Sequence, residues 1–357
     1  MLSIRCLGRE LVGVFYALIL ATAIFFAGCF EDEGRNVGEV EEAFFAINLQ
    51  KQNKRYRAWR EVEVDTLAVI GRSGKGILYK PGYVKGDSSG VYVIDYGDSS
   101  VKKFDKNGNL IVKYGQGRGE GPGEFINPTG VAIGENGMVW VADGGARSLN
   151  WFTSDGDFLR KLTFEDGILR VAPIEGGWCY LMRISPLKPK IFFLYNAEDA
   201  LMRSFGELVE NYRDVALSLS GDILSVRKDM IYVSSYYGVI LRFDINGKLA
   251  YAREGIEKGK PPQVETGQAK GNFFQRIVNK KTLYNCPSLR DEKLYLHAFS
   301  TSKEIGASVL DVYHVTDGTY QYSFKLPGFS ICTSVAGDYI YTLQDTTAVV
   351  YRVREVD

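Results

Sequence analysis

Histidine is nearly absent from this sequence. Only His297 and His314 occur among 357 residues, so a His-rich metal centre or a serine–histidine triad has few residues from which to form. The GxSxG motif of a nucleophilic serine and the DxDxDG pattern of a calcium-binding loop are also missing. We therefore expect no catalytic residue, no bound metal and no cofactor, and we favour a protein that is not an enzyme.

Neither sign of charge predominates. The chain has 43 Lys and Arg against 43 Asp and Glu, and no tract of one sign stands out. Binding to nucleic acid relies on a basic surface that neutralises phosphates. We therefore expect no nucleic-acid partner.

Cysteine is sparse and follows no metal-binding spacing. Five cysteines occur, and no CxxC pair is among them. Cys179, Cys286 and Cys332 lie far apart in the part of the chain that follows the N-terminal segment. One pair of them could form a disulfide in an oxidising compartment, but we expect three buried free thiols.

A long apolar run lies at the N-terminus. Arg5 and Arg9 precede an uncharged stretch over residues 11–26, and the tetrapeptide FAGC follows at residues 26–29. Small residues directly before a cysteine resemble a bacterial lipobox, although Phe replaces the usual leucine at its first position. This pattern predicts a lipoprotein signal peptide over residues 1–28 and a lipid on Cys29 that holds the chain at a membrane. The alternatives are an uncleaved membrane anchor and an ordinary secretory signal.

A polar stretch follows Cys29 and extends to about residue 60. Its acidic cluster at Glu31, Asp32 and Glu33 resembles the surface-export signal of Bacteroidetes lipoproteins. The simpler interpretation, which we favour, is a solvated tether over residues 29–60. The expected location is the cell envelope, with the outer membrane favoured and its periplasmic or surface face left open.

Two stretches of the chain repeat one another. Residues 90–111, GVYVIDYGDSSVKKFDKNGNLI, align with residues 138–159, MVWVADGGARSLNWFTSDGDFL, at a constant offset of 48. Each copy contains an apolar strand that ends near an Asp, a second strand that ends in Phe, and an Asn-Gly or Asp-Gly hairpin turn. A period of about 40–50 residues in a β-rich sequence is typical of a propeller blade.

Weaker copies of this pattern continue to the C-terminus and predict four strands in each blade. Residues 62–355 accommodate six such units. The predicted fold class is therefore all-β, a six-bladed β-propeller of four-stranded antiparallel blades over residues 61–357. Val62–Ile70 should supply the outer strand of the final blade and close the ring, so that no sheet edge is left unpaired.

The stretches GQGRGEGPGEF at residues 115–125, NPTGVAI at 127–133 and WFTSDGDFL at 151–159 resemble an NHL-type repeat. More closely, the chain resembles the six-bladed propeller lipoproteins that are abundant in Bacteroidetes, whose blades carry a similar glycine-rich connector. The clear match covers residues 76–165. The resemblance implies the fold and the envelope location, and it implies no activity.

Glycine occupies every second position of the connector from Gly115 to Gly123. A phosphate-binding loop would need GxGxxG or GxxxxGK before a helix, and neither occurs here. We expect a structural crossing between two blades that uses the positive φ angles open to glycine. Arg118, Glu120 and Glu124 are candidates for contact with a partner or with the mouth of the channel, although a salt bridge between blades explains them as well.

The side chains that face the central channel should come from the innermost strand of each blade. We place four of these strands at residues 129–133, 169–172, 215–219 and 331–335. These ranges contain no Asp, Glu, Asn or His, and Arg170 is their single charged residue, which makes it a candidate binding residue. The recurring Asp95 and Asp143 end other strands and precede turns, where Asp accepts hydrogen bonds from backbone amides.

These features favour a lipid-anchored propeller that binds a protein, peptide or glycan partner on one face. The alternative is a channel enzyme, either a metal-dependent lyase or a lactonase-like hydrolase. Such an enzyme would hold a cation with several oxygen ligands, which the expected innermost strands lack. The segment over residues 253–290 exceeds a normal blade connection and is either functional or disordered.

Overall fold

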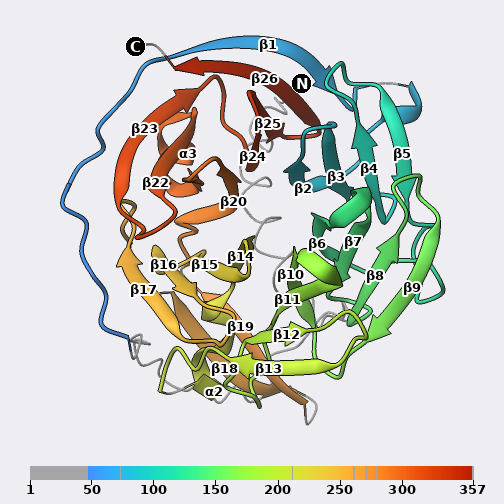
Figure 1. Cartoon of the computed structure of the whole chain (residues 1–357), viewed down its shortest axis with the longest axis vertical. Coiled ribbons are helices and arrows are strands. Elements are labelled where there is room, and N and C mark those ends of the chain that lie inside the picture. The colour runs from blue at the N-terminus through green and yellow to red at the C-terminus, as the bar shows by residue number, and fades with distance from the viewer. Residues whose placement is uncertain are drawn as a thin grey trace, which may run out of the picture.

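Six sheets surround one central axis. The structure is a computed structural model that describes residues 47–72, 74–210, 212–259, 262–269, 272–278 and 280–355. Its six four-stranded antiparallel sheets stand in a ring like the blades of a propeller (Figure 1), which confirms the predicted fold class. The predicted signal peptide and the lipidation site Cys29 lie outside the described residues. Within those residues no helix is both long enough and apolar enough to cross a membrane.

The first five blades take their strands in chain order from the axis outwards. Blade one has β2 (Pro81–Gly86), β3 (Val91–Asp95), β4 (Ser100–Phe104) and β5 (Leu110–Tyr114). Blade two has β6 (Pro128–Ile133), β7 (Val139–Asp143), β8 (Ser148–Phe152) and β9 (Phe158–Thr163). Blade three has β10 (Ile168–Ile174), β11 (Trp178–Arg183), β12 (Phe192–Tyr195) and β13 (Leu201–Phe205).

The remaining blades follow the same plan. Blade four has β14 (Gly221–Val226), β15 (Asp229–Ser234), β16 (Val239–Phe243) and β17 (Leu249–Glu254). Blade five has β20 (Tyr284–Arg290), β21 (Lys293–Ala298), β22 (Ser308–His314) and β23 (Tyr320–Leu326). Blade six has β24 (Cys332–Ala336), β25 (Tyr339–Gln344), β26 (Thr347–Glu355) and, outermost, β1 (Val62–Ile70). Short helical turns are η2 (Gly74–Gly76), η3 (Glu135–Gly137) and η4 (Glu175–Gly177), and the helix α3 (Phe299–Ile305) follows β21.

The turn between β4 and β5 shows why the repeat is recognisable. Asp105 Oδ1 accepts hydrogen bonds from the backbone N–H groups of Asn107 and Asn109 at 2.9 and 2.8 Å. Gly108 has a φ of +89°, a left-handed conformation that other residues rarely adopt. Asp244 makes the same kind of bonds in blade four. An Asp and a glycine within a few residues of each other thus set the register of these two hairpins.

Aromatic side chains fill the spaces between neighbouring blades. Phe152 of blade two contacts Phe125 and Tyr114 with ring centroids 5.8 and 5.9 Å apart. Phe192 of blade three contacts Phe243 of blade four at 5.5 Å. Buried aromatic pairs of this kind contribute about 0.5–1.5 kcal/mol each beyond the area they bury. Each blade is therefore held mainly by the faces of its two neighbours.

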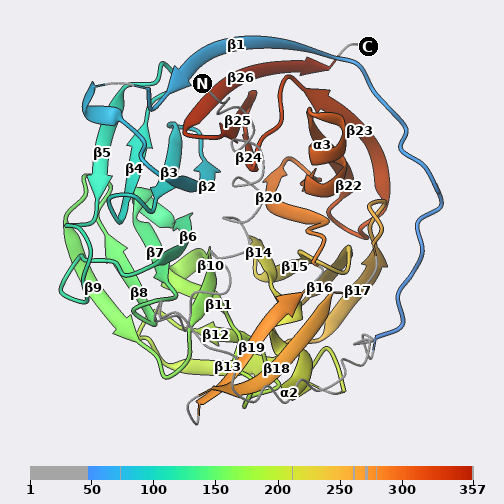
Figure 2. The same cartoon turned by 180° about the vertical axis from the view of Figure 1, so that it is seen from behind.

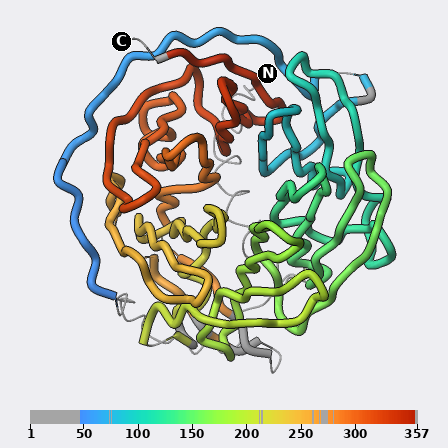
Figure 3. The backbone as a smooth tube through the Cα atoms, viewed as in Figure 1, coloured from blue at the N-terminus to red at the C-terminus, as the bar shows by residue number. Residues whose placement is uncertain are grey.

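The ring closes through pairing between the two ends of the described chain. β1 pairs antiparallel with β26, from Val62 opposite Glu355 to Ile70 opposite Ala348. Figure 3 shows these first and last parts of the backbone side by side at the outer edge of the ring. The predicted closure by β1 is confirmed.

Residues 47–60 do not form the solvated tether that we expected. They run along the outer edges of blades four and five before β1 begins (Figure 1), and we call them the strap. Gln50 forms a parallel bridge with Arg253 of β17, and Trp59 forms one with β23. The polar composition of this segment did not predict the packing, because its side chains form hydrogen bonds with residues far away in the sequence. Gln52, for example, donates to carbonyl groups 202 and 266 positions away.

Arg57 is the point at which the strap enters the protein interior. Its Nε and Nη2 donate to Asp311 at 2.8 Å each, and Nη2 also pairs with Glu257. The side chains of Asp311 and Glu257 are 0% and 4% exposed. Burial lowers the pKa of Arg57, but the hydrogen bonds and charges of the two carboxylates together raise it above its usual value. Without the guanidinium, two buried carboxylates would lose their cation.

Of two other segments, the sequence left the first open and assigned the second wrongly. Residues 253–290 contain an antiparallel hairpin of β18 (Gln263–Ala269) and β19 (Asn272–Val278), which lies in front of the ring in Figure 2. Residues 215–219, expected as an innermost strand, belong instead to α2 (Tyr212–Val215) and η5 (Ala216–Leu219). Their apolar side chains pack into the core between blades three and four, and a buried helical turn shows the same short apolar run as a strand.

We expect the Arg57→Ala variant to be less stable than the wild type by about 3–5 kcal/mol, the usual cost of leaving a buried charge unpaired. Urea denaturation of the chain, followed by tryptophan fluorescence, measures this difference. Arg55→Ala is the matched control, because Arg55 is exposed on the same strap and should change the free energy of unfolding by less than about 0.5 kcal/mol. Equal effects of the two substitutions would contradict an interior role for Arg57.

Candidate functional site

A belt of contacts around the axis joins the innermost strands. Arg170 of β10 and Asp222 of β14 form an ion pair between blades three and four. Arg170 Nη1 also donates to the carbonyl oxygen of Thr129 of β6 at 2.6 Å. Asp222 Oδ2 accepts from the backbone N–H of Cys286 of β20 at 3.1 Å. Blades two to five are thus joined in order through groups on the axis.

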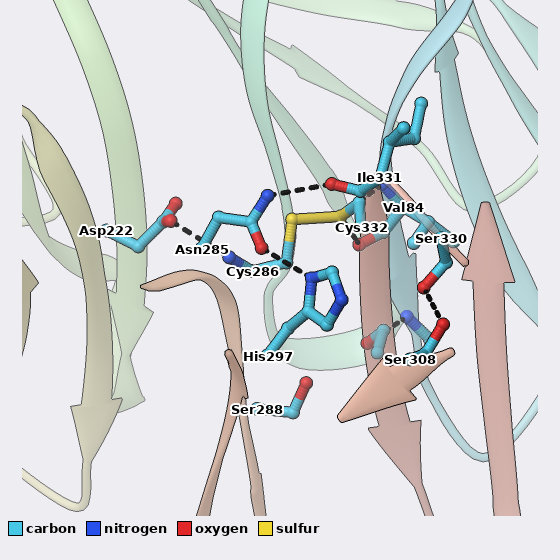
Figure 4. Close-up of a disulfide and its surroundings, with 12 residues drawn as sticks. Val84, Asp222, Asn285, Cys286, Ser288, His297, Ser308, Ser330, Ile331 and Cys332 are labelled. Atoms are coloured by element: carbon cyan, nitrogen blue, oxygen red, sulfur yellow. Dashed lines mark hydrogen bonds between the residues drawn. A yellow bond between two sulfur atoms is a disulfide. The ribbon is translucent and has the colours of Figure 1, made fainter. Parts of the chain in front are cut away.

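A disulfide between Cys286 and Cys332 carries the belt from blade five to blade six (Figure 4). The backbone N–H of Val84 of β2 donates to Cys332 Sγ at 3.4 Å and brings in blade one. Our expectation of three free thiols is therefore wrong for two of them, while Cys179 is buried and free. The bonded cysteines are 46 residues apart. Because this separation is close to one repeat, the fold puts them on adjacent innermost strands with Cα atoms 5.6 Å apart.

Three tyrosines lie near enough to Arg170 for its charge to act on their hydroxyls. The Tyr83 ring centroid lies 5.1 Å from the guanidinium carbon. Burial raises the pKa of Tyr83, Tyr96 and Tyr236, to about 12 for Tyr96, and the charge of Arg170 opposes this rise in each case. All three hydroxyls therefore stay protonated at neutral pH and remain donors. None of them has a hydrogen-bond partner among the described residues, and the hydroxyl of Tyr236 is buried.

Tyr96 and Tyr236 define the end of the axis at which this site lies. Each follows the second strand of its blade, Tyr96 after β3 and Tyr236 after β15. In an antiparallel blade the second strand ends where the innermost strand begins. Arg170 and Asp222 both lie near the beginning of their innermost strands. We call these four residues together with Tyr83 the axial site.

Lys85 brings a second positive charge to the axis. It follows Tyr83 by two positions on β2, so both side chains leave the same face of the strand. Burial lowers the pKa of Lys85 and the carboxylate of Asp222 raises it. No described residue, Asp222 included, forms an ion pair or hydrogen bond with its ammonium group. Sequence reasoning missed Lys85, although the match of Pro81 to Pro128, which begin β2 and β6, could have located the strand.

The innermost strands therefore carry more charge than we expected. Our ranges fell on β6, β10 and β24, but the innermost strand of blade four is β14, which contains Asp222. β20 adds the polar Asn285 and the charged Arg290, and β2 adds Lys85. The expectation that Arg170 is the single charged residue of these strands is wrong. Among the residues that the structure describes, no group of three or more His, Cys, Asp and Glu side chains is placed to hold a metal ion.

His297 lies near the disulfide in a fully buried position (Figure 4). Its Nδ1 is 2.7 Å from Asn285 Oδ1, while Asn285 Nδ2 donates to the carbonyl oxygen of Ile331 at 2.7 Å. Since an amide oxygen only accepts, His297 donates from Nδ1. Burial lowers the pKa of His297 to about 3. The ring is therefore neutral at pH 7 and orients Asn285 between blades five and six.

Asp95 and Asp143 cap backbone amides, as the sequence predicted. Both oxygens of Asp143 accept backbone N–H groups at 2.7 to 3.0 Å, two from the connector into blade two and two from the turn after β7. Asp95 makes equivalent bonds in blade one. Each carboxylate therefore holds a connector against a turn, and Asp95 also forms a buried ion pair with Lys102 at 2.7 Å.

The glycine-rich connector is a compact structural crossing. The backbone N–H of Phe125 donates to the carbonyl oxygen of Gly117 at 3.0 Å, and the Phe125 ring is buried. Gly123 has a φ of +72°, as the expected crossing requires. Glu124 turns back and accepts the backbone N–H of Gly121 at 2.8 Å. Glu124 therefore stabilises the loop itself.

The four binding candidates from the sequence do not come together. Arg118 and Glu120 are exposed on the connector, and no hydrogen bond or ion pair within the described residues links either of them, or Glu124, to Arg170. Arg170 is the one candidate that lies on the axis. Contact between the connector residues and a partner stays a prediction.

Comparison with solved structures supports the fold. No protein-family model matches the chain. A protein of Bacteroides fragilis named as exported has a TM-score of 0.58 at 12% identity, over 86% of this chain and 99% of that one. A streptogramin B lyase scores 0.52 at 10% identity, over 82% and 98% of the two chains. The virginiamycin B lyase of Staphylococcus aureus scores 0.52 at 8% identity, over 83% and 100%. Structural similarity at such low sequence identity shows only that the chain has the propeller fold.

One relative is similar in sequence over a short stretch. A Caenorhabditis elegans protein named as a probable peptidyl-alpha-hydroxyglycine alpha-amidating lyase is 36% identical over 90 residues. The match covers 22% of this chain and 26% of the relative, so this chain spans about a quarter of that protein's length. The match indicates a distant NHL-like homologue.

We expect Tyr236→Phe to leave the stability unchanged or to raise it by about 1 kcal/mol, because its buried hydroxyl lacks a partner among the described residues. Tyr232→Phe is the matched control in the same blade. The Tyr232 hydroxyl donates to the carbonyl oxygen of Leu219 at 2.7 Å, so its loss should cost about 1–3 kcal/mol. Thermal denaturation compares the two variants. A loss in Tyr236→Phe as large as in Tyr232→Phe would show that this hydroxyl is structurally bonded.

Proposed function

We propose that this chain is a binding module of the cell envelope that takes a protein, peptide or glycan partner at one end of its central axis. The observation that carries this proposal is a set of three tyrosine hydroxyls near Arg170 that have no partner among the described residues. Buried polar groups in proteins are normally hydrogen-bonded. A cluster that is left unpaired lowers stability and is typical of a site that a ligand completes. Tyrosine and arginine also dominate the hot spots of binding sites.

We further propose that a lipid on Cys29 holds the chain at the outer membrane, on its periplasmic or surface face. Two findings support a location outside the cytoplasm. One is the structural likeness to a protein named as exported. The other is the disulfide between Cys286 and Cys332, because disulfides persist in oxidising compartments and are rare in the cytosol.

Metabolic labelling with an alkyne fatty acid tests the anchor. The wild-type chain should incorporate the label, and Cys29→Ala should lose it, because the lipid is attached to that cysteine. The variant should then be released or remain an uncleaved precursor. Cys179→Ala, which removes a buried free thiol, is the control and should keep the label. Undiminished labelling of Cys29→Ala would rule out lipidation at this residue.

An array of envelope glycans and peptides, probed with the full chain, tests axial binding. We expect the wild type to bind at least one member, and the Tyr96→Phe, Tyr236→Phe double variant to bind it about 5- to 150-fold more weakly, since each lost hydrogen bond costs about 0.5–1.5 kcal/mol. Tyr251→Phe is the control. Its hydroxyl is also buried without a partner among the described residues, but it lies on the outer strand β17. A ligand that the double variant binds as tightly as the wild type would place binding elsewhere.

The second candidate function is a lyase that uses the same site. It is favoured by the short likeness to the alpha-amidating lyase and by tyrosine hydroxyls beside a guanidinium, which suit proton transfer and charge stabilisation. With a peptidyl-α-hydroxyglycine, cleavage of the bond between the amide nitrogen and the α-carbon would yield a peptide amide and glyoxylate. Glyoxylate release by the wild type, assayed with added divalent cations and absent from the double variant, would favour this function over binding.

A further inference from the structure

We propose that the axial site recognises a carboxylate group on its ligand. This inference rests on the proposed binding function and names the chemistry that the ligand presents. It follows from the hydrogen-bond donors, acceptors and charges that meet at the axis.

The axial site and Lys85, two positions from Tyr83 on β2, offer free donors. Arg170 directs Nε to Asp222 and Nη1 to the carbonyl oxygens of Thr129 and Leu169, and its Nη2 has no partner among the described residues. The three tyrosine hydroxyls and the Lys85 ammonium also have no hydrogen-bond partner among the described residues. An ammonium and a guanidinium only donate. A ligand group that satisfies this set must therefore supply acceptors.

The one carboxylate at the axis is already in use. Asp222 Oδ1 pairs with Arg170, and Oδ2 accepts the backbone N–H of Cys286. Its side chain is 3% exposed. A ligand amine could reach Asp222 only by displacing a contact of the belt, so a cationic group is disfavoured.

The net charge of the innermost strands favours a ligand group that carries a single negative charge. Arg290 at the far end of β20 pairs with Asp338 at 3.2 Å. The innermost strands carry three further charged residues, Lys85, Arg170 and Asp222, with an excess of one positive charge. Buried charge is costly unless it is compensated. One carboxylate compensates this excess, whereas a phosphate monoester brings about 1.5–2 negative charges at neutral pH.

A purely structural role does not account for Lys85. A partly buried ammonium without an anion of its own loses hydration and gains no hydrogen bond in return. An apolar side chain of similar length, such as methionine, would fill the same space at lower cost. The lysine is explained if an anion from outside the chain completes the site.

Matched pairs of small probes test the inference. D-galacturonate is compared with D-galactose, and N-acetylglycine with N-acetylglycinamide. In each pair the first compound carries a carboxylate and the second is neutral. The two pairs also separate a sugar acid from a peptide terminus as the source of the group. Titration calorimetry of the full chain in detergent, at constant ionic strength, gives the dissociation constants. We expect at least one acid to bind tenfold or more tightly than its neutral partner, and galactose 1-phosphate to bind more weakly than that acid.

Substitution of Lys85 tests whether the preference for the acid probe arises at the axis. Lys85→Gln should reduce the preference for the acid at least tenfold and leave the affinity for the neutral partner within about twofold. Lys103→Gln is the matched control, since Lys103 lies on β4 of the same blade and its removal changes the net charge equally. Circular dichroism of both variants shows that the fold is retained.

The outcomes separate this inference from the function on which it rests. Equal binding of acid and neutral probes, or a preference that survives in Lys85→Gln, overturns the carboxylate inference. Failure of both acids to bind overturns it as well. In each case axial binding still stands if the array ligand is lost in the Tyr96→Phe, Tyr236→Phe variant. If the array ligand is also insensitive to those tyrosines, the proposed function fails together with the inference.

Discussion

The ion pair between Arg170 and Asp222 holds the centre of the propeller. Wedge-shaped blades pack well over their broad outer faces, but their narrow ends leave little apolar surface to bury at the axis. Here polar contacts replace it. The pair binds blade three to blade four, and each partner also engages a backbone group of the next blade, Arg170 the carbonyl oxygen of Thr129 and Asp222 the N–H of Cys286. Loss of either charge would leave the other buried and unpaired, so these two residues are constrained together.

The belt explains why unpaired groups can exist beside it. A tyrosine hydroxyl without a hydrogen-bond partner would normally gain one through a small movement of its strand or ring. Tyr83 is held on β2, whose backbone bonds to Cys332, and Cys332 is covalently linked to blade five. The strand that carries Tyr83 is therefore tied to blade six and, through the disulfide, to blade five. Rigidity at the axis keeps the donors oriented before a ligand arrives, which reduces the entropy that binding would otherwise cost.

The sequence was sufficient for the fold and insufficient for the site, because the two depend on different ranges of interaction. Hairpins are specified by neighbours, as Asp105 and Gly108 show, so a repeat of hairpins is visible in the residues themselves. The axial contacts join residues about one blade apart. Arg170 and Asp222 are separated by 52 positions and the bonded cysteines by 46. A search for complementary residues at about one period would have found both. Residues 215–219 misled us because a short apolar run suits a strand and a buried helical turn equally well.

The strap adds a constraint that no repeat could reveal. The N-terminal part of the described chain bridges β17 of blade four, then β23 of blade five, and then pairs along β26 of blade six. Three consecutive blades are thereby joined at their outer edges by one continuous segment, and Arg57 fastens that segment into blade five through Asp311. The same three blades are joined at the axis by Asp222, Cys286 and Cys332. Blades held at both their inner and outer edges cannot open independently. Access to the proposed axial site therefore cannot come from separation of these three blades.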